Sequence, residues 1–134
     1  MIRMLLYIHS GVRYLVLLMG VLTLGYALFG LATKRPYDRM MLRLARLFTA
    51  SVHLQVVLGV AVVLSGRFYS ALIGHIMMMV FAAVTTTVVT AVMRRRAPEA
   101  RSWLPHVVGT LVTLALIVFG IMAIGRSPLG MSGR

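Results

Sequence analysis

Residues 68–93 read FYSALIGHIMMMVFAAVTTTVVTAVM, a run without any Asp, Glu, Lys or Arg. About 20 such residues suffice to cross the roughly 30 Å hydrocarbon core of a bilayer as an α-helix, which rises about 1.5 Å per residue. In lipid the backbone N–H and C=O groups have no water to bind and must form hydrogen bonds with each other, which favours a helix over other structures. Three more uncharged runs cover residues 14–33, 47–66 and 102–125. The sequence therefore predicts four membrane-spanning helices.

The composition agrees with a membrane protein. The 134 residues are 60% hydrophobic and 12% charged, with a mean hydropathy of +0.96. A soluble domain with this balance would expose large apolar patches. We expect one transmembrane domain over residues 1–134, with an all-α, up-down four-helix bundle because the connections are short. The expected spans cover about residues 5–33, 44–66, 69–93 and 102–125.

The basic residues predict the orientation of these spans. Although the formal net charge is +12, the 14 basic residues lie in short clusters between apolar runs, so we expect no nucleic-acid partner. The first and third loops contain most of them: Lys34, Arg35, Arg39, Arg43, Arg46, Arg94, Arg95, Arg96 and Arg101. This excess predicts that both loops are cytoplasmic and that both termini lie on the outer, periplasmic side of a bacterial inner membrane. Anionic membrane lipid is an expected partner of the arginine runs.

Two further patterns concern the helix ends. Arg39, Arg43 and Arg46 recur at helical spacing ahead of the second apolar run, which predicts that this helix extends into the cytoplasmic interface. Aromatic residues near the predicted interfaces indicate an interfacial belt. They are Tyr7, Tyr14, Phe68, Tyr69 and Trp103.

Several kinds of chemistry are excluded by missing residues. The chain has no Cys, which removes disulfides, thiolate metal sites and covalent haem attachment. Its two acids, Asp38 and Glu99, both fall in predicted loops. The spans therefore contain no carboxylate pair for acid–base catalysis and no acidic proton relay. We expect an electron carrier or a subunit rather than a stand-alone enzyme.

The four histidines are the main candidate site residues. Each predicted helix carries one, and they are His9, His53, His75 and His106. Ionisable groups at membrane depth are costly unless partnered, so they are functional candidates. Counting about 1.5 Å per residue places the first and third toward the outer side, and the second and fourth roughly 5 to 10 Å inside the cytoplasmic boundary. In an up-down bundle each same-depth pair lies diagonally opposite, which predicts two facing pairs.

Facing neutral imidazoles, with no acid or thiol nearby, suit axial ligation of a haem iron. Three segments carry a resemblance: His9-Ser-Gly-Val-Arg13-Tyr14, Val52-His53-Leu-Gln55 and Gly74-His75-Ile-Met-Met. Together they resemble membrane b-type cytochromes, with bis-histidine haems inside a four-helix bundle, and small bacterial membrane proteins labelled cytochrome b. The resemblance implies one or two haem b groups, with iron bound by His9 and His75 and by His53 and His106.

Two arginines are candidate ligands for a haem propionate, since guanidinium binds carboxylates bidentately. Arg13 follows His9 by one helical turn, and Arg67 lies near the same outer surface. Two features strain the pattern. Simple counting puts His9 several ångströms farther out than His75, and His106 follows Pro105 in a first helical turn, where interfacial water can satisfy it.

The leading hypothesis is a membrane electron-transfer protein that passes electrons between a quinol pool or partner subunit and an acceptor. Quinone, other membrane redox subunits or a second copy are the expected partners. The alternative is a cofactor-free accessory subunit of a larger respiratory or photosynthetic complex, whose histidines make helix-to-helix hydrogen bonds.

A third possibility is a small transporter or metal-handling protein. The 11 methionines include Met77, Met78 and Met79, which with histidine could bind copper. Consecutive residues point around a helix, however, so these methionines more simply fill apolar gaps. The threonines at positions 85, 86, 87 and 90 are expected to bond to carbonyls of the preceding turn or across helices.

Overall fold

The computed structural model describes residues 2–66 and 68–125. It contains four long helices and one short 3-10 helix, η1. They are α1 (Ile2–Thr33), α2 (Arg39–Leu64), α3 (Leu72–Arg95), η1 (Pro98–Ala100) and α4 (Leu104–Met122). All four long helices are long and apolar enough to cross a membrane.

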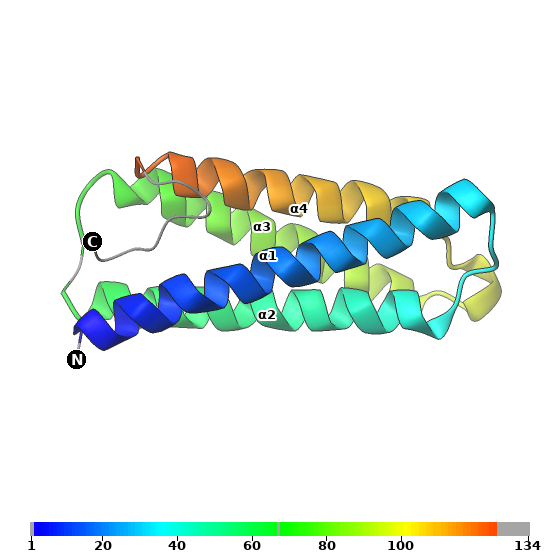
Figure 1. Ribbon diagram of the computed structural model, residues 1–134, viewed down its shortest axis with the longest axis horizontal. Helices are drawn as coiled ribbons and strands as arrows, with labels where there is room; N and C mark the ends of the chain where they lie inside the picture. Colours follow the sequence, from blue (N-terminus) through cyan, green and yellow to red (C-terminus); the bar gives the residue numbers. More distant parts are fainter. Residues whose placement is uncertain (1, 67, 126–134) are drawn as a thin grey trace.

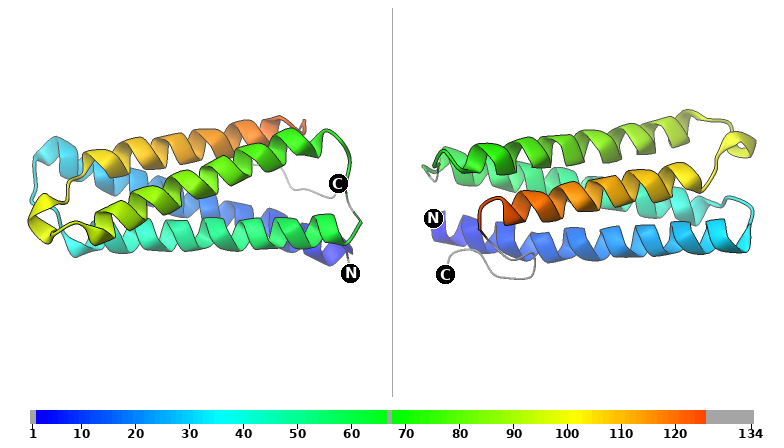
Figure 2. Two further views of the ribbon diagram at one scale, coloured as in Figure 1. Left: turned by 180° about the vertical axis from the view of Figure 1, so that it is seen from behind. Right: turned by 90° about the horizontal axis from the view of Figure 1, so that it is seen from above.

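Consecutive helices run in opposite directions, so that α1 begins and α4 ends at the same end of an elongated bundle (Figure 1). Helix α1 packs against α2 and α4, and α3 packs against the same two neighbours. Views from behind and from above show the four helices lying side by side along the long axis (Figure 2). Helices α1 and α3 are therefore diagonal to each other, as are α2 and α4.

The helix ends differ from the expected spans by a few residues, for local reasons. Helix α2 begins at Arg39 rather than near residue 44, because the carboxylate of Asp38 accepts a hydrogen bond from the Met41 backbone N–H at 3.1 Å. This confirms the extension indicated by the arginine spacing. At the end of α1, Lys34 adopts a φ of 55°, and the Arg35 N–H reaches the Gly30 carbonyl at 3.1 Å, as in a Schellman cap.

The bundle is apolar outside and partly polar inside. Large hydrophobic side chains such as Leu18, Val57 and Phe119 are more than half exposed. The central core is small and apolar, and it consists of Val16, Phe48, Val52, Ala82, Ile117 and Ile121. Hydroxyl, imidazole and guanidinium groups are buried at Ser10, Arg13, Thr23, Thr49, Thr86, Thr90, His106 and Thr113. Such a distribution suits a lipid solvent, which covers apolar faces and leaves polar groups to pair internally.

A hydroxyl cluster joins α2 to α3 in the middle of the bundle. Thr49 Oγ1 lies 2.8 Å from Thr86 Oγ1 and 2.9 Å from Thr90 Oγ1. Thr85 and Thr87 instead donate to carbonyls four residues earlier in α3. The two kinds of bond predicted for this threonine run are therefore confirmed.

An aromatic cluster closes the end of the bundle where α1 meets α2. Trp103 packs against Tyr26 and Tyr37, with ring centroids 5.6 and 5.4 Å away, and its Nε1 donates to the Arg35 carbonyl at 2.7 Å. Its side chain is only 6% exposed. Trp103 thus lies at a helix end, as expected of a belt residue, but faces protein because the loop after α1 folds over it.

Candidate functional site

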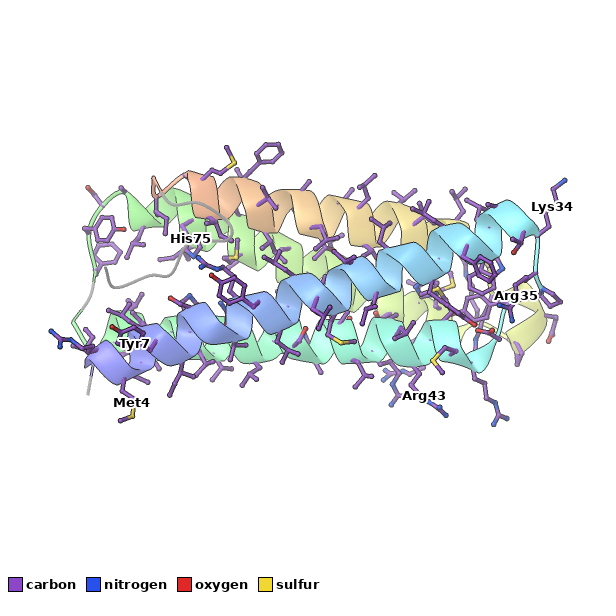
Figure 3. The ribbon with its side chains drawn as sticks, viewed as in Figure 1. Met4, Tyr7, Lys34, Arg35, Arg43 and His75 are labelled. Carbon is purple, nitrogen blue, oxygen red and sulfur yellow. The ribbon has the colours of Figure 1, made fainter. Side chains whose placement is uncertain are left out.

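A cavity of about 270 Å³ lies between the four helices, toward the end where α1 begins. Polar side chains reach it from three helices: His9 and Arg13 from α1, Gln55 from α2, and His75 from α3. The last lies toward the end of the bundle that Met4 and Tyr7 mark in Figure 3. The other lining residues are mostly apolar, and four of them are also exposed on the outside: Val60, Leu64, Tyr69 and Val80. The cavity therefore opens to the surface between α2 and α3.

His75 is held by the neighbouring helix. Its Nδ1 lies 2.8 Å from the carbonyl oxygen of Gly120 in α4. A carbonyl oxygen can only accept, so Nδ1 carries the proton and the neutral ring has its lone pair on Nε2. A Cβ at Gly120 would lie 2.5 Å from Met79 Cε and 3.0 Å from Met78 Cβ, so glycine at this position leaves room for α3 beside α4. Histidines that bind metals are commonly oriented by such a bond from the other ring nitrogen.

His9 lies across the cavity, on α1. Its ring rests against Gly59 of α2, where a Cβ would stand 3.2 Å from His9 Cε1. Gln55 Nε2 donates to the His9 backbone carbonyl at 2.8 Å and ties the two helices together. The His9 Nδ1 and the Gln55 Oε1 are both buried without a hydrogen-bond partner. Within the described residues, each of these two atoms is therefore still able to form a hydrogen bond with a ligand.

Arg13 is a buried cation. Its side chain is 5% exposed, and its Nε and Nη2 have no hydrogen-bond partner, although its guanidinium lies 5.2 Å from the Tyr14 ring centroid. A buried charge without a counterion costs several kcal/mol. Residues 2–66 and 68–125 offer no carboxylate here, because Asp38 caps α2 and Glu99 lies in η1, both at the opposite end of the bundle. An anion supplied from outside the chain would remove this cost.

In the described part of the chain, the buried polar side-chain atoms that have no hydrogen-bond partner all lie at the cavity. Among the residues that the structure describes, four buried side-chain atoms have no hydrogen-bond partner: His9 Nδ1, Arg13 Nε, Arg13 Nη2 and Gln55 Oε1. All three residues line the cavity that His75 also lines. Buried polar groups are nearly always paired in folded proteins, and those that are not call for an explanation such as a ligand. The cavity is therefore the candidate functional site.

The other two histidines have separate partners. His53 is exposed, and its Nε2 lies 2.7 Å from Thr87 Oγ1 of α3. His106 is 1% exposed, stacks on Tyr37, and places its Nε2 2.7 Å from the Tyr37 hydroxyl. Burial raises the pKa of Tyr37 to about 12, so this hydroxyl stays protonated at neutral pH. The structure thus brings His9 and His75 to one cavity but gives His53 and His106 different neighbours.

Arg67, the other candidate propionate ligand, lies outside the described residues. Gln55 and Gly59 belong to the site but were not among the predicted cofactor-binding residues, although Gln55 lies in one of the segments that carry the resemblance. The sequence signal for Gln55 was that it is the only Gln of the chain. Its helical face became clear only from the structure, where Val52, three residues earlier on the same face, is buried. His53, one position from Val52, falls on another face.

Within residues 2–66 and 68–125, no three His, Asp or Glu side chains gather as a metal site would require. A haem needs only two protein ligands, so this observation does not bear on it. No family model matches the chain, and no curated protein or solved structure is significantly similar to it.

Proposed function

We propose that this protein is a small membrane electron-transfer protein that binds one b-type haem in the cavity between His9 and His75. One observation carries the proposal: the imidazoles of His9 and His75 line the same cavity. Every buried polar side-chain atom that lacks a hydrogen-bond partner in the described chain belongs to a residue that lines this cavity as well. A haem with two histidine ligands supplies reversible one-electron transfer at its iron. No acid, thiol or hydroxyl nucleophile is needed for that task.

The chain's own residues have distinct roles in this proposal. The Gly120 carbonyl sets the tautomer and orientation of His75, while Gly59 leaves room for the ring of His9. Apolar walls from Val16, Ile117 and Ile121 exclude water from the site. Arg13 offers two unpaired N–H groups to a carboxylate, which is how guanidinium binds a propionate.

The cavity volume of about 270 Å³ lies below the roughly 300–1,000 Å³ of typical small-molecule sites. Its opening between α2 and α3 gives a flat ligand room to extend beyond the enclosed part. The same opening would face lipid, where a quinol or a redox subunit can exchange electrons with the site. We assign no second haem to His53 and His106, because among the described residues they line no common cavity and their Nε2 atoms bond to different partners, Thr87 and Tyr37.

We further propose that the four helices span a bacterial inner membrane with both termini on the outer side. The support is the excess of basic residues on the α1–α2 and α3–α4 connections. Because the chain lacks Cys, single cysteines report the topology directly. Ser70→Cys should react with a membrane-impermeant maleimide in intact cells, and Glu99→Cys only after lysis. The reverse pattern would refute this orientation.

Absorption spectroscopy of the protein purified in detergent tests the haem proposal. The reduced-minus-oxidised spectrum should contain the α and Soret bands of a b-type haem, and His9→Ala should abolish them. His53→Ala is the matched control, because it removes an imidazole that lies outside the cavity, and its bands should match the parent protein. A folded protein that stays colourless after haem is added would instead favour the cofactor-free accessory subunit.

A further inference from the structure

A second recess lies at the opposite end of the bundle, close to the start of α2. It has a volume of about 400 Å³ and is lined by Arg39, Leu42, Arg43, Arg46, Leu47 and Arg101. Three of the arginines come from one face of α2, and the fourth follows η1 in the connection to α4. Figure 3 shows Arg43 pointing outward from α2 at this end. Four cations therefore surround one recess.

The position of Arg101 is fixed by the chain. Its Nε donates to the Met93 carbonyl at 2.9 Å, and its Nη2 donates to the Arg94 carbonyl at 3.0 Å, both at the end of α3. These bonds hold the Arg101 guanidinium beside the three arginines of α2. Like charges repel, so gathering four guanidiniums around one recess costs free energy unless an anion offsets it.

The described chain supplies no such anion. Its single salt bridge in residues 2–66 and 68–125 joins Arg35 to Asp38 at 3.6 Å. Asp38 also accepts hydrogen bonds from Tyr26 and from the Met41 N–H, and Glu99, the other acid among these residues, makes no salt bridge. The four guanidiniums of the recess therefore have no carboxylate in an ion pair with them.

The position of the recess along α2 indicates the kind of anion. A helix of 26 residues is about 39 Å long at about 1.5 Å per residue, or about 9 Å longer than a typical hydrocarbon core. With the rest of α2 in the core, its first turns, which carry the arginines, reach the headgroup layer. Leu42 and Leu47 line the same recess, and Leu47 is 53% exposed. An apolar wall beside a cationic one matches a molecule with both an acyl chain and a phosphate.

We propose that this recess binds the phosphate headgroup of an anionic phospholipid. Arginine suits the role, because guanidinium donates two parallel hydrogen bonds to phosphate oxygens. The acyl chain of the same lipid would follow Leu42 and Leu47 toward the apolar face of α2. The recess shares no lining residue with the cavity at His9 and His75, so lipid binding is tested separately from haem binding.

Native mass spectrometry of the intact protein in detergent tests the proposal. The probes are dioleoyl phosphatidylglycerol and dioleoyl phosphatidylcholine, which share acyl chains and differ in headgroup charge. The site variant is Arg43→Gln with Arg46→Gln. The control is Arg94→Gln with Arg95→Gln, which removes the same charge from exposed residues at the same end but outside the recess.

Phosphatidylglycerol should bind the parent protein in preference to phosphatidylcholine. The site variant should lose on the order of tenfold in affinity for it, as expected for two arginine contacts, and the control about twofold or less. Equal losses in both variants would mean diffuse attraction and would overturn the proposal, as would equal binding of the two lipids. Displacement of the lipid by millimolar inorganic phosphate would reassign the site to the free ion. If the double variant does not fold, the single change at the exposed Arg43 serves in its place.

Discussion

His75 of α3 donates a hydrogen bond from Nδ1 to the carbonyl oxygen of Gly120 in α4, 2.8 Å away. One bond thereby joins two helices, orients the ring and decides which nitrogen carries the lone pair. The same contact is compatible with a purely structural histidine. Substitutions that separate the two ring nitrogens can distinguish these roles.

Replacing His75 by Asn separates the structural role from the ligand role. The Asn amide nitrogen lies near the position of imidazole Nδ1, so the bond to Gly120 can be kept while nothing replaces Nε2. We expect thermal stability in detergent close to that of the parent protein and haem bands below detection. An His75→Asn protein that retains its full haem content would show that this ring is not an iron ligand.

Replacing Arg13 by Met should raise the stability of the haem-free protein. The change removes a buried guanidinium with two unpaired nitrogens and keeps an apolar stem of similar length. We expect a gain of about 1 to 3 kcal/mol in thermal unfolding, with weaker retention of added haem. Arg3→Met, on the exposed side of the same helix, is the control and should change neither quantity. Lower stability in Arg13→Met would mean that the guanidinium has a partner that we have not identified.

Replacing Thr49 by Val should weaken the contact between α2 and α3. Val keeps the shape of Thr but loses the bonds at 2.8 and 2.9 Å to Thr86 and Thr90. Hydrogen bonds between helices in membranes average about 0.6 kcal/mol, so we expect a loss of roughly 1 kcal/mol by thermal or denaturant unfolding. Thr85→Val removes only a bond within α3 and should cost less. Equal costs for both changes would show that the cluster adds nothing between helices.

Replacing Gly30 by Ala should be strongly destabilising, because its Cβ would lie 2.4 Å from ring atoms of Trp103. That ring cannot move without losing its contacts with Tyr26 and Tyr37, so we expect a cost of about 1 to 3 kcal/mol. Gly25→Ala is the control in the same helix. Nothing lies within 4 Å of its Cβ position, and alanine should be neutral or stabilising by up to about 1 kcal/mol. Similar unfolding temperatures for the two variants would contradict the packing at Trp103.

The helices could be predicted from the sequence because uncharged runs of about 20 residues leave few alternatives in lipid. Even the early start of α2 followed from the spacing of Arg39, Arg43 and Arg46. The position of Trp103 could not be predicted in this way, because it depends on how the loop after α1 folds back over the helix end.

The site was predictable only in part. Depth counting placed His9 and His75 at one end of the bundle, where they line one cavity. Depth counting could not decide which face of α2 carries His53 and which carries Gln55. A helix turns by about 100° per residue, so two positions apart these side chains point in nearly opposite directions, about 160° apart. Knowing that Val52 is buried settles this, since Gln55 shares its face and His53 does not.

The central claim is that His9 and His75 bind the same haem iron. Electron paramagnetic resonance of the oxidised, haem-loaded protein tests it most directly, because two imidazole ligands give a low-spin ferric signal. We predict that signal in the parent protein and in His53→Ala, and its loss in His9→Ala. A low-spin signal that persists unchanged in His9→Ala would contradict the account, as would a parent protein that shows only high-spin iron.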